Sequence, residues 1–323
     1  MPRNFLEQEA ANRRRTWLIM VLFVVFLTVI GAGLDAVVFG GGYPIATATA
    51  IVIGVVSAWW TYRWGDRAIL KSSSAVPLED SIRNATSDDE RLRLEQYGNI
   101  VHEVAIAAGL PAPAAWVIPD DDPNAFATGR DPAHASIAVT AGLLRTLDRE
   151  ELQAVVGHEM SHVRNYDIRL MMVIAALMGA VLLLAHWSSR ALWFDGRGRR
   201  NNRNGGAGMV VLLVVWIVAI VLAPIAARLL SLMVSRTREY LADASGAELT
   251  RNPLALASAL RKIDAAAQPT EHINQGTAAL CIADPAARPV NERDGFWANL
   301  WATHPPIPKR IAALEAMAGQ SAA

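Results

Sequence analysis

The chain contains a single cysteine, Cys281, among 323 residues. One cysteine excludes an intramolecular disulfide framework, and it excludes zinc sites built from clustered thiolates. Any metal site must therefore use histidine and carboxylate ligands, and the chain has only 7 histidines. The sequence also lacks a Gly-x-Ser-x-Gly elbow and a Gly-x4-Gly-Lys loop. Their absence disfavours a serine hydrolase and a phosphate-binding loop.

Charge is also scarce, because charged residues make up 19% of the chain and the formal net charge is zero. Soluble proteins average about 25% charged residues, so this chain has too few charged side chains to cover the surface of a compact soluble protein of its size. The neutral balance removes any general attraction to nucleic acid, and neither a nucleic acid nor a nucleotide is predicted as a partner. Apolar residues reach 53%, and membrane residence is the first hypothesis.

Two long apolar runs lie near the start of the chain. Residues 17–34 are uncharged and follow a cluster of three arginines, and this length is enough to span a bilayer. A cleaved signal peptide has a similar basic start, but its apolar region is only about 7–15 residues long, which favours a retained helix. After the glycines at 40–42, a second run over 45–62 leads into tryptophans typical of a membrane interface. Basic residues flank this pair and are absent from its turn, which predicts that both ends are cytoplasmic.

Two further apolar runs cover residues 168–187 and 209–234, and the second contains Pro224 and Arg228. The loop between them, residues 188–208, carries five arginines, which conflicts with the positive-inside rule if both runs cross the membrane. Either the early spans determine the topology despite this loop, or the second pair is a hairpin that does not fully cross. Both alternatives return the chain to its starting side.

The segment over residues 72–167 has the pattern of a soluble region. A capping box at residues 87–90 begins an amphipathic helix that ends before Gly109. Short β-type runs at 115–118 and 136–140 predict a small sheet. Later helices are predicted over residues 253–267 and 307–317.

A second helix of this region is predicted to begin at Asp148 with Glu151 and to run on into the third apolar segment. It carries His158 and His162, which lie about 40° apart at 3.6 residues per turn, so both imidazoles can reach one ion. Zinc with two histidines, a carboxylate and an open position lowers the pKa of bound water to about 7. Glu159 can take the proton of that water and deliver it to the leaving amine. A chance match to this pattern is rare, so we predict one zinc per chain.

The carboxylate ligand is expected from a helix that directly follows the fourth apolar run. Glu239 and Asp243 lie four residues apart and share one helical face. With Glu239 on the metal, Asp243 can accept the outer N–H of a liganding histidine and so fix its tautomer and orientation. The alternative is a solvated acidic face paired with Arg236 and Arg238. The HExxH pattern elsewhere in the chain favours the metal site.

The chain resembles the HtpX family of membrane-bound, heat-shock-linked zinc metallopeptidases, which are related to the prenyl-protein endoproteases. The matching stretches are residues 124–129, residues 157–162 continuing to Asn165 and Asp167, residues 235–243, and residues 304–306 with Arg310 and Ile311. The resemblance implies that His158, His162 and Glu239 hold zinc. It also implies that Glu159 is the general base.

The same resemblance gives roles to residues outside the two metal helices. It implies that His304 stabilises the oxyanion and that Arg310 supports the site, although a histidine beside two prolines is also a common loop residue. Metallopeptidases add an extended substrate to an edge strand through backbone hydrogen bonds, and Asn124, Ala125 and Phe126 resemble that substrate-binding edge. The alternative for this segment is a hairpin loop that closes at the following glycine.

The predicted metal site lies beside the membrane. Five residues separate His162 from Ile168, which at about 1.5 Å per helical residue places the metal roughly 10 Å from the membrane surface. The expected substrates are therefore misfolded or damaged membrane proteins that are cut in cytoplasmic loops. An intramembrane protease is disfavoured because charged residues flank the histidine motif. A transporter is disfavoured because only Arg228 lies well inside an apolar run.

The predicted fold is α+β and mainly helical, with two apolar helical hairpins and a gluzincin-type zinc peptidase domain that contains a small β-sheet. The predicted parts are an N-terminal membrane hairpin over 1–71 (spans about 17–38 and 45–64), a first catalytic part over 72–167, a second membrane hairpin over 168–234 and a second catalytic part over 235–323. The predicted function is a multi-pass zinc endopeptidase of the plasma (inner) membrane that acts in protein quality control at the cytoplasmic face. The alternative is a non-proteolytic, zinc-containing membrane scaffold or chaperone factor.

Overall fold

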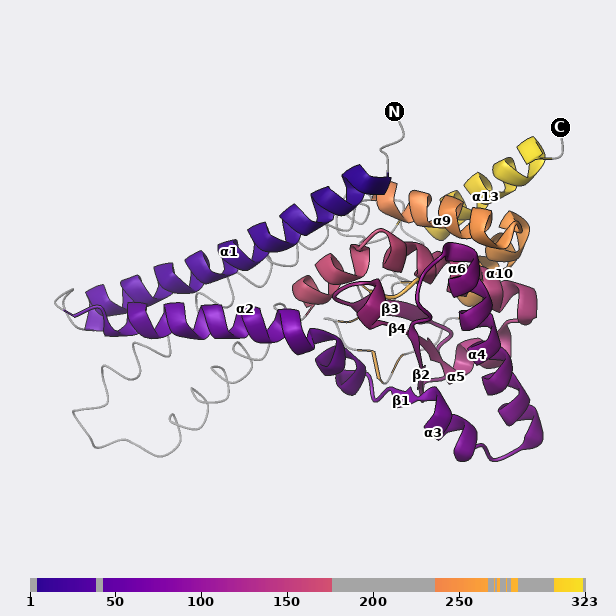
Figure 1. Ribbon diagram of the computed structural model, residues 1–323, viewed down its shortest axis with the longest axis horizontal. Coiled ribbons are helices and arrows are strands. Elements are labelled where there is room, and N and C mark those ends of the chain that lie inside the picture. The colour runs from indigo at the N-terminus through magenta and orange to yellow at the C-terminus, as the bar shows by residue number, and fades with distance from the viewer. Residues whose placement is uncertain are drawn as a thin grey trace.

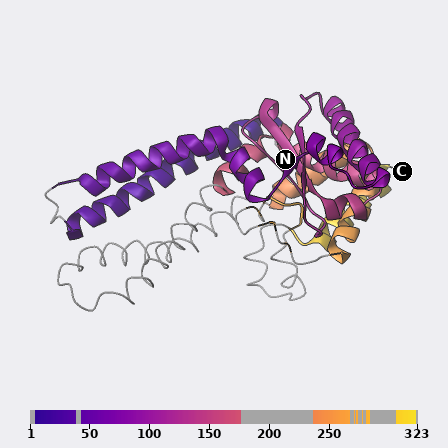
Figure 2. The same ribbon diagram turned by 90° about the horizontal axis from the view of Figure 1, so that it is seen from below.

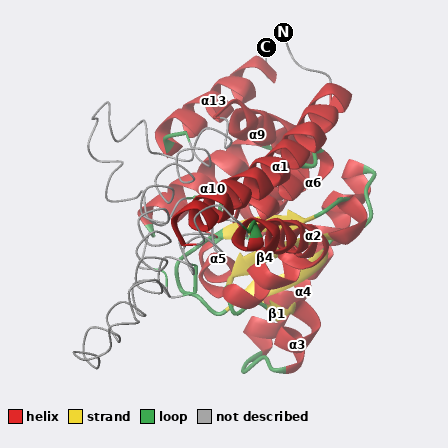
Figure 3. Cartoon of the chain, turned by 90° about the vertical axis from the view of Figure 1, so that its left-hand side faces the viewer, coloured by secondary structure: helices red, strands yellow, loops and turns green. Residues whose placement is uncertain are grey.

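The computed structural model describes residues 5–38, 43–175, 236–266, 270, 272–273, 277, 280–283 and 305–321. Within these residues the chain is mainly helical and contains one four-stranded sheet. A long helical hairpin projects from a body in which helices surround the sheet (Figures 1 and 3). This confirms the mainly helical α+β class. Most of the predicted second hairpin, residues 176–234, and His304 lie outside the described residues.

The projecting hairpin consists of α1 (Phe5–Val38) and α2 (Ile45–Ser72). By length and composition, both helices are able to cross a membrane, over Ala10–Gly33 and Ile45–Ser72. Only 18% and 17% of their apolar windows are buried, unlike the core helices of a soluble protein. Trp17, Val29 and Val52 are all more than half exposed along the hairpin, which Figure 2 shows standing away from the body. The first two predicted spans therefore correspond to exposed apolar helices.

The sheet has the strand order β1-β2-β4-β3. Its strands are β1 (Val76–Pro77), β2 (Ala114–Ile118), β3 (Ala125–Gly129) and β4 (Ala135–Thr140). β2 runs parallel to β4, and β3 runs antiparallel to β4 with Ala125 opposite Val139. The β-type runs predicted at 115–118 and 136–140 are confirmed as β2 and β4, whereas the two-residue β1 was too short to predict. β3 is an edge strand, and it is also one arm of a hairpin with β4.

Gly129 ends β3 in a conformation that only glycine adopts readily. Its φ is +141°, and a Cβ at this position would collide with the carbonyl oxygen of His134. The chain then passes through the short 3-10 helix Pro132–His134 and enters β4. The glycine therefore closes the β3–β4 connection and determines where the edge strand ends.

The body contains the predicted helices and two short helices that were not predicted, over residues 78–83 and 141–146. They are α3 (Leu78–Arg83), α4 (Asp88–Ala108), α5 (Ala141–Thr146), α6 (Arg149–Arg164), α9 (Arg236–Thr250), α10 (Pro253–Ala265) and α13 (Ile307–Ser321). Gly109 ends α4 in the left-handed conformation with φ at 66°. The capping box of α6 is complete between Asp148 and Glu151. At α4 the backbone N–H of Glu90 donates to Ser87, but the Glu90 carboxylate accepts from Thr86 instead of completing the predicted box.

α6 does not run on into the third apolar segment. It ends at Arg164, and Asn165 and Tyr166 form a turn before the helical residues 167–175. Tyr166 has a φ of 57°, a left-handed conformation in which a right-handed helix cannot continue. The expectation of one unbroken helix was wrong, because neither proline nor glycine marks this break. The distance of about 10 Å to the membrane, which assumed that helix, has no structural support.

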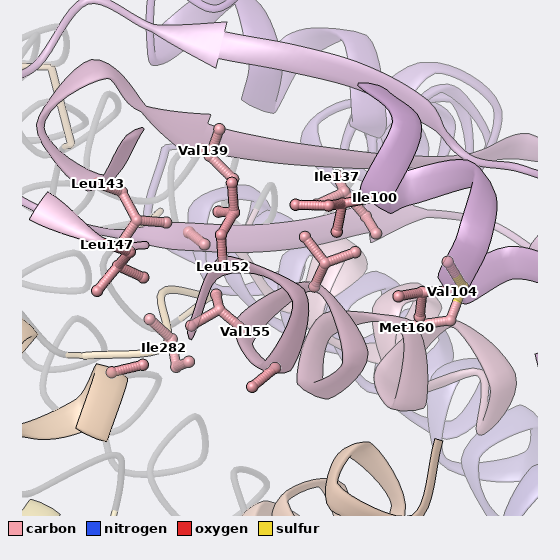
Figure 4. Close-up of a cluster of buried hydrophobic side chains, with 14 of the residues drawn as sticks. Ile100, Val104, Ile137, Val139, Leu143, Leu147, Leu152, Val155, Met160 and Ile282 are labelled. Atoms are coloured by element: carbon pink, nitrogen blue, oxygen red, sulfur yellow. The ribbon is translucent and has the colours of Figure 1, made fainter. Parts of the chain in front are cut away.

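A hydrophobic core lies between α4, the sheet and α6 (Figure 4). Ile100 of α4, Ile137 of β4 and Val155 and Met160 of α6 are all completely buried in it. Burying each such side chain contributes about 1.5–3 kcal/mol, so this core holds one side of α6 firmly against the sheet.

The opposite side of α6 packs directly on the backbone of α9. A Cβ placed on Gly246 of α9 would lie 2.8 Å from the backbone nitrogen of His158. A Cβ placed on Gly157 of α6 would lie 2.9 Å from Cγ2 of Thr250. Real Cβ atoms essentially never approach this closely, and at Gly246 the contact is with backbone, so only glycine fits there without moving the helices apart. The crossing brings the acidic side chains of α9 to the histidines of α6.

Candidate active site

Three candidate ligands from two helices converge on one point. His158 and His162 lie one turn apart on α6, and Glu239 lies in the first turn of α9. One ligand atom of each residue lies within 4.8 Å of the other two. The Nε2 atoms of the two histidines are 3.3 Å apart, and Glu239 oxygens lie 3.8 Å from His158 Nε2 and 3.7 Å from His162 Nε2. The structure therefore brings the three predicted ligands together.

A carboxylate engages the outer nitrogen of each histidine. His158 Nδ1 lies 3.0 Å from an Asp243 oxygen, and His162 Nδ1 lies 3.1 Å from Asp167 Oδ2. Because a carboxylate only accepts hydrogen bonds, each Nδ1 carries the proton, and each Nε2 lone pair points to the shared point in the neutral ring. The position of Asp243 agrees with its expected role as the partner of a liganding histidine.

Burial and charge act in opposite directions on the pKa of His162. The ring is 17% exposed, and desolvation opposes its protonation. The hydrogen bond to Asp167 and the negative charges of Glu239 and Asp167 outweigh desolvation and raise the pKa of His162 to about 9. The site therefore has a net preference for positive charge at this ring.

Glu159 lies next to the two histidines and is 1% exposed. Its Oε1 atom is buried and has no hydrogen-bond partner within the residues that the structure describes. Burial raises the pKa of Glu159, although His158, His162 and Arg310 oppose that rise. A buried carboxylate oxygen that lacks a protein partner is available to a water molecule or a reacting group.

Arg310 of α13 supports the site from behind Asp243. Its guanidinium is fully buried and donates to both carboxylate oxygens of Asp243, from Nε at 2.9 Å and from Nη2 at 2.6 Å. A third hydrogen bond, from Nη1 to the carbonyl oxygen of Ile282, measures 2.9 Å. Although burial opposes ionisation, Arg310 and His158 lower the pKa of Asp243 to about 2. The position of Arg310 is consistent with its expected supporting role.

The cavity beside these groups is small. Its volume is about 20 Å³, which is room for one water-sized occupant. Ala127 of β3 and Leu280, Cys281 and Ile282 line it together with Glu159. A cavity of this volume has room for a water molecule or an ion and is too small for a peptide.

The predicted substrate-binding segment forms the edge next to this cavity. The Ala125 carbonyl oxygen accepts a hydrogen bond of 2.9 Å from the backbone N–H of Ile282. The Asn124 side chain donates to the carbonyl oxygen of Ala283 at 2.8 Å, and Phe126 is completely buried. The segment is thus an edge strand whose backbone at Ala125 is hydrogen bonded to a later part of the same chain.

Several residues of the site were not assigned a role from the sequence. Asp167 is the partner of His162, and Arg238 contacts the same carboxylate through Nη1 at 3.4 Å. Gly157 and Gly246 set the approach of the two helices. The only sequence signal for them is that Gly157, Asp167 and Arg238 stand inside the stretches that carry the family resemblance, whereas Gly246 stands outside these stretches.

A family model and curated relatives both cover most of the chain. Residues 92–318 match the family described as Peptidase family M48. The chain is 42% identical over 312 residues to "Protease HtpX homolog" of Ligilactobacillus salivarius, with 96% of this chain and 99% of the relative covered. It is 41% identical over 316 residues to "Protease HtpX homolog" of Caldanaerobacter subterraneus, with 98% of each covered. The crystal structure of S. mikatae Ste24p aligns with a TM-score of 0.48 and 15% identity, over 96% of this chain and 67% of that chain.

Proposed function

The chain belongs to peptidase family M48, and from this premise we propose that it is a membrane-bound zinc endopeptidase whose metal is held by His158, His162 and Glu239. The observation that carries this proposal is the convergence of their ligand atoms within 4.8 Å. Two imidazole nitrogens and one carboxylate, with space left beside them, are the ligand set of catalytic zinc sites of the gluzincin type. The outer nitrogens are held by Asp243 and Asp167, as zinc-binding histidines require.

Zinc, when bound, supplies a Lewis acid that polarises the scissile carbonyl group and lowers the pKa of water at the site. The protein must supply the base. Glu159 Oε1 is buried beside the histidines and has no partner in the described part of the chain. We assign it to accept the proton of the attacking water and to pass it to the leaving nitrogen. Its raised pKa suits a group that acts first as a base and then as an acid.

The substrate is proposed to bind along the edge of β3. The carbonyl oxygen of Ala125 is a backbone acceptor on that edge, and Ala127 lines the cavity that contains Glu159. A peptide paired with this edge would place its backbone next to the catalytic carboxylate. Asn124, Ala125 and Phe126 would then hold the peptide through the strand and its packing, and His304 keeps its expected role as the oxyanion stabiliser.

Membrane proteins are the proposed class of substrate. The exposed hairpin α1–α2 and the relatives named Protease HtpX homolog support a membrane location. Basic residues flank the hairpin and are absent from its turn, which supports an active site on the cytoplasmic side of the inner membrane. An enzyme anchored in this way meets the loops of misfolded or damaged membrane proteins, which supports a role in quality control. Reporter fusions at residue 323 test the orientation, because a periplasmic reporter signal would contradict it.

Metal content and proteolysis, measured together in detergent, test the proposed function. The wild type is expected to contain one zinc per chain and to cleave casein. Glu159→Gln is expected to contain the same amount of zinc and to lose at least about 100-fold in activity, because a general base contributes about 10²–10⁴-fold. His158→Gln is the matched variant on the neighbouring position, and it is expected to lose both the zinc and the activity.

The alternative, a zinc-containing scaffold or chaperone factor, predicts a different outcome. A scaffold has no need for a buried carboxylate beside the metal, so its activity would survive Glu159→Gln. Wild-type protein that binds zinc and cleaves neither casein nor a membrane-protein loop would favour the scaffold. A wild-type protein that contains no zinc would contradict both the zinc endopeptidase and the zinc-containing scaffold.

A further inference from the structure

Asn12 is a buried polar residue at the beginning of the first apolar helix. It lies in α1 and is 2% exposed, although Arg13, Arg14 and Arg15 beside it are all exposed. Its side-chain amide donates two hydrogen bonds out of the helix, to Asp167 Oδ1 at 2.7 Å and to the carbonyl oxygen of Asn165 at 3.0 Å. Both acceptors follow directly after α6, more than 150 residues later in the chain.

The two acceptors belong to the turn that brings Asp167 back to the site. Asn165 ends α6, Tyr166 takes the left-handed conformation, and Asp167 begins the next helical segment. The two carboxylate oxygens of Asp167 contact different residues. Oδ2 contacts His162 Nδ1 at 3.1 Å, while Oδ1 accepts from Asn12 and lies 3.4 Å from Arg238.

We propose that Asn12 is a positioning residue of the metal site, which holds Asp167 and through it orients His162. The neutral amide donates to one oxygen of Asp167 without cancelling the charge of the carboxylate, and it leaves the other oxygen to accept from the histidine. The two hydrogen bonds of Asn12 hold the backbone of the turn at Asn165 and the side-chain rotamer of Asp167. Through Asn12, α1 supports the metal site, although the two are far apart in the sequence.

This inference depends on the proposed zinc site, and zinc affinity of the full-length protein in detergent tests it. Removing a partner of a metal-binding histidine weakens metal affinity about 10- to 100-fold, so this loss is expected for Asp167→Ala. Asn12→Ala acts one step further away and is expected to weaken zinc binding about three- to tenfold. The visible spectrum of the cobalt-substituted protein should shift in both variants, because it reports on the geometry of the ligands.

The double variant Asn12→Ala/Asp167→Ala separates positioning from general packing. If Asn12 acts through Asp167, the double variant binds zinc as Asp167→Ala does. If Asn12 only stabilises the fold, its effect adds to that of Asp167→Ala, or the melting temperature falls while zinc affinity is unchanged, and either result overturns the proposal. Asn12→Asp keeps the size of the side chain and removes its donor, so it must weaken zinc binding at least as much as Asn12→Ala.

Thr16→Val is the matched control on the same helix. Thr16 is 1% exposed, and its hydroxyl donates to the carbonyl oxygen of Asn12 within α1. Its zinc affinity is expected to equal that of the wild type. If Thr16→Val weakens zinc binding as much as Asn12→Ala does, the effect comes from the packing of α1 and the proposal is wrong. A wild type that binds no zinc would instead refute the proposed function.

Discussion

Asp243 keeps its negative charge inside the protein because a buried guanidinium contacts both of its oxygens. Arg310 donates to Asp243 from Nε and Nη2, and the Asp243 carboxylate in turn faces Nδ1 of His158. A buried charge whose partner is removed costs far more than an exposed charge, since water cannot replace the lost contact. Arg310 therefore stabilises the fold and the orientation of a ligand at the same time.

Arg310→Met is expected to lower the free energy of unfolding by about 3–5 kcal/mol, because it leaves Asp243 buried without its cation. Denaturant unfolding of the zinc-free protein in detergent measures this loss. Arg261→Met is the matched control, since Arg261 pairs with Glu315 while both side chains are about half exposed. Its loss is expected to stay below about 1 kcal/mol. Equal losses in the two variants would contradict the buried pair as the cause.

The stability of the zinc-free protein is expected to fall with rising pH through the titration of His162. The pKa of this ring is 6.5 in its ordinary state and about 9 in the folded protein. The folded state therefore binds the proton more tightly, and the stabilisation is fully present below pH 6.5 and is lost as the pH rises to about 9. Unfolding free energies across this range test the prediction, and Asp167→Asn should flatten the dependence.

Zinc binding is expected to show the opposite dependence on pH. The metal takes the position of a proton on His162, so its affinity should rise about tenfold per pH unit below the pKa of that ring. Competition with a chelator at several pH values measures this slope. An affinity that is independent of pH between 6.5 and 9 would contradict the raised pKa.

At the scale of elements, the active site depends on how closely α6 and α9 cross. The two helices meet at Gly157 and Gly246, where neither has a side chain that would hold the backbones apart. His158 is adjacent to this crossing, so a change in helix separation moves a ligand directly.

Gly246→Ala is expected to push α9 away from α6, because the new Cβ would lie 2.8 Å from the nitrogen and 2.9 Å from the Cα of His158. Overpacking of this kind costs about 1–3 kcal/mol, and zinc affinity should fall with it. Gly319→Ala is the matched control, since nothing lies within 4 Å of a Cβ at this position of α13. Thermal unfolding and zinc content measure both variants, and the control should be unchanged or slightly more stable.

The predictable part of the site is the part that follows helical periodicity. His158 and His162 stand four residues apart, as do Glu239 and Asp243, and the period of a helix alone places each pair on one face. The end of α6 could not be predicted in the same way, since Tyr166 adopts a left-handed conformation without a glycine or a proline nearby. The role of Asp167 follows from that turn and was therefore also missed.

Contacts between distant parts of the chain were beyond prediction for a related reason. Ile282 reaches the site from a loop segment whose packing depends on the whole core, and only the family resemblance implied that Arg310 supports the site. In the sequence, Asn12 is simply a polar residue that precedes a basic cluster. Its hydrogen-bond partners lie more than 150 residues away, so the sequence does not indicate them. A residue pattern of period 3.6 or 2 carries no information on such pairs.

At the scale of the whole molecule, an apolar hairpin and a polar, buried site are joined in one chain. α1 and α2 expose large apolar side chains along their length, whereas most residues of the site are buried. Figure 1 shows the hairpin of these two helices projecting from the body. The hairpin is therefore expected to be covered by lipid, and its first helix contacts the turn after α6 near the beginning of that helix, at Asn12.

Val52→Arg is expected to weaken membrane insertion by about 2.5–3.5 kcal/mol, because Val52 is 62% exposed on α2 and would present a charge to lipid. The fraction that resists alkaline carbonate extraction measures this effect. Leu92→Arg is the matched control, since Leu92 is 63% exposed on α4 of the body. It should remain in the membrane fraction like the wild type. Equal extraction of the two variants would contradict a spanning α2.

The hydrogen bond between Ile282 and Ala125 weakens the binding of any peptide that pairs with β3 at the same position. A peptide that pairs with β3 at Ala125 competes with the protein's own backbone for the same carbonyl oxygen. Only the fraction of molecules in which Ile282 has moved away is ready to bind, so the apparent dissociation constant equals the intrinsic one divided by that fraction. If β3 is the substrate edge, as proposed, a peptide binds there only while Ile282 is displaced from Ala125.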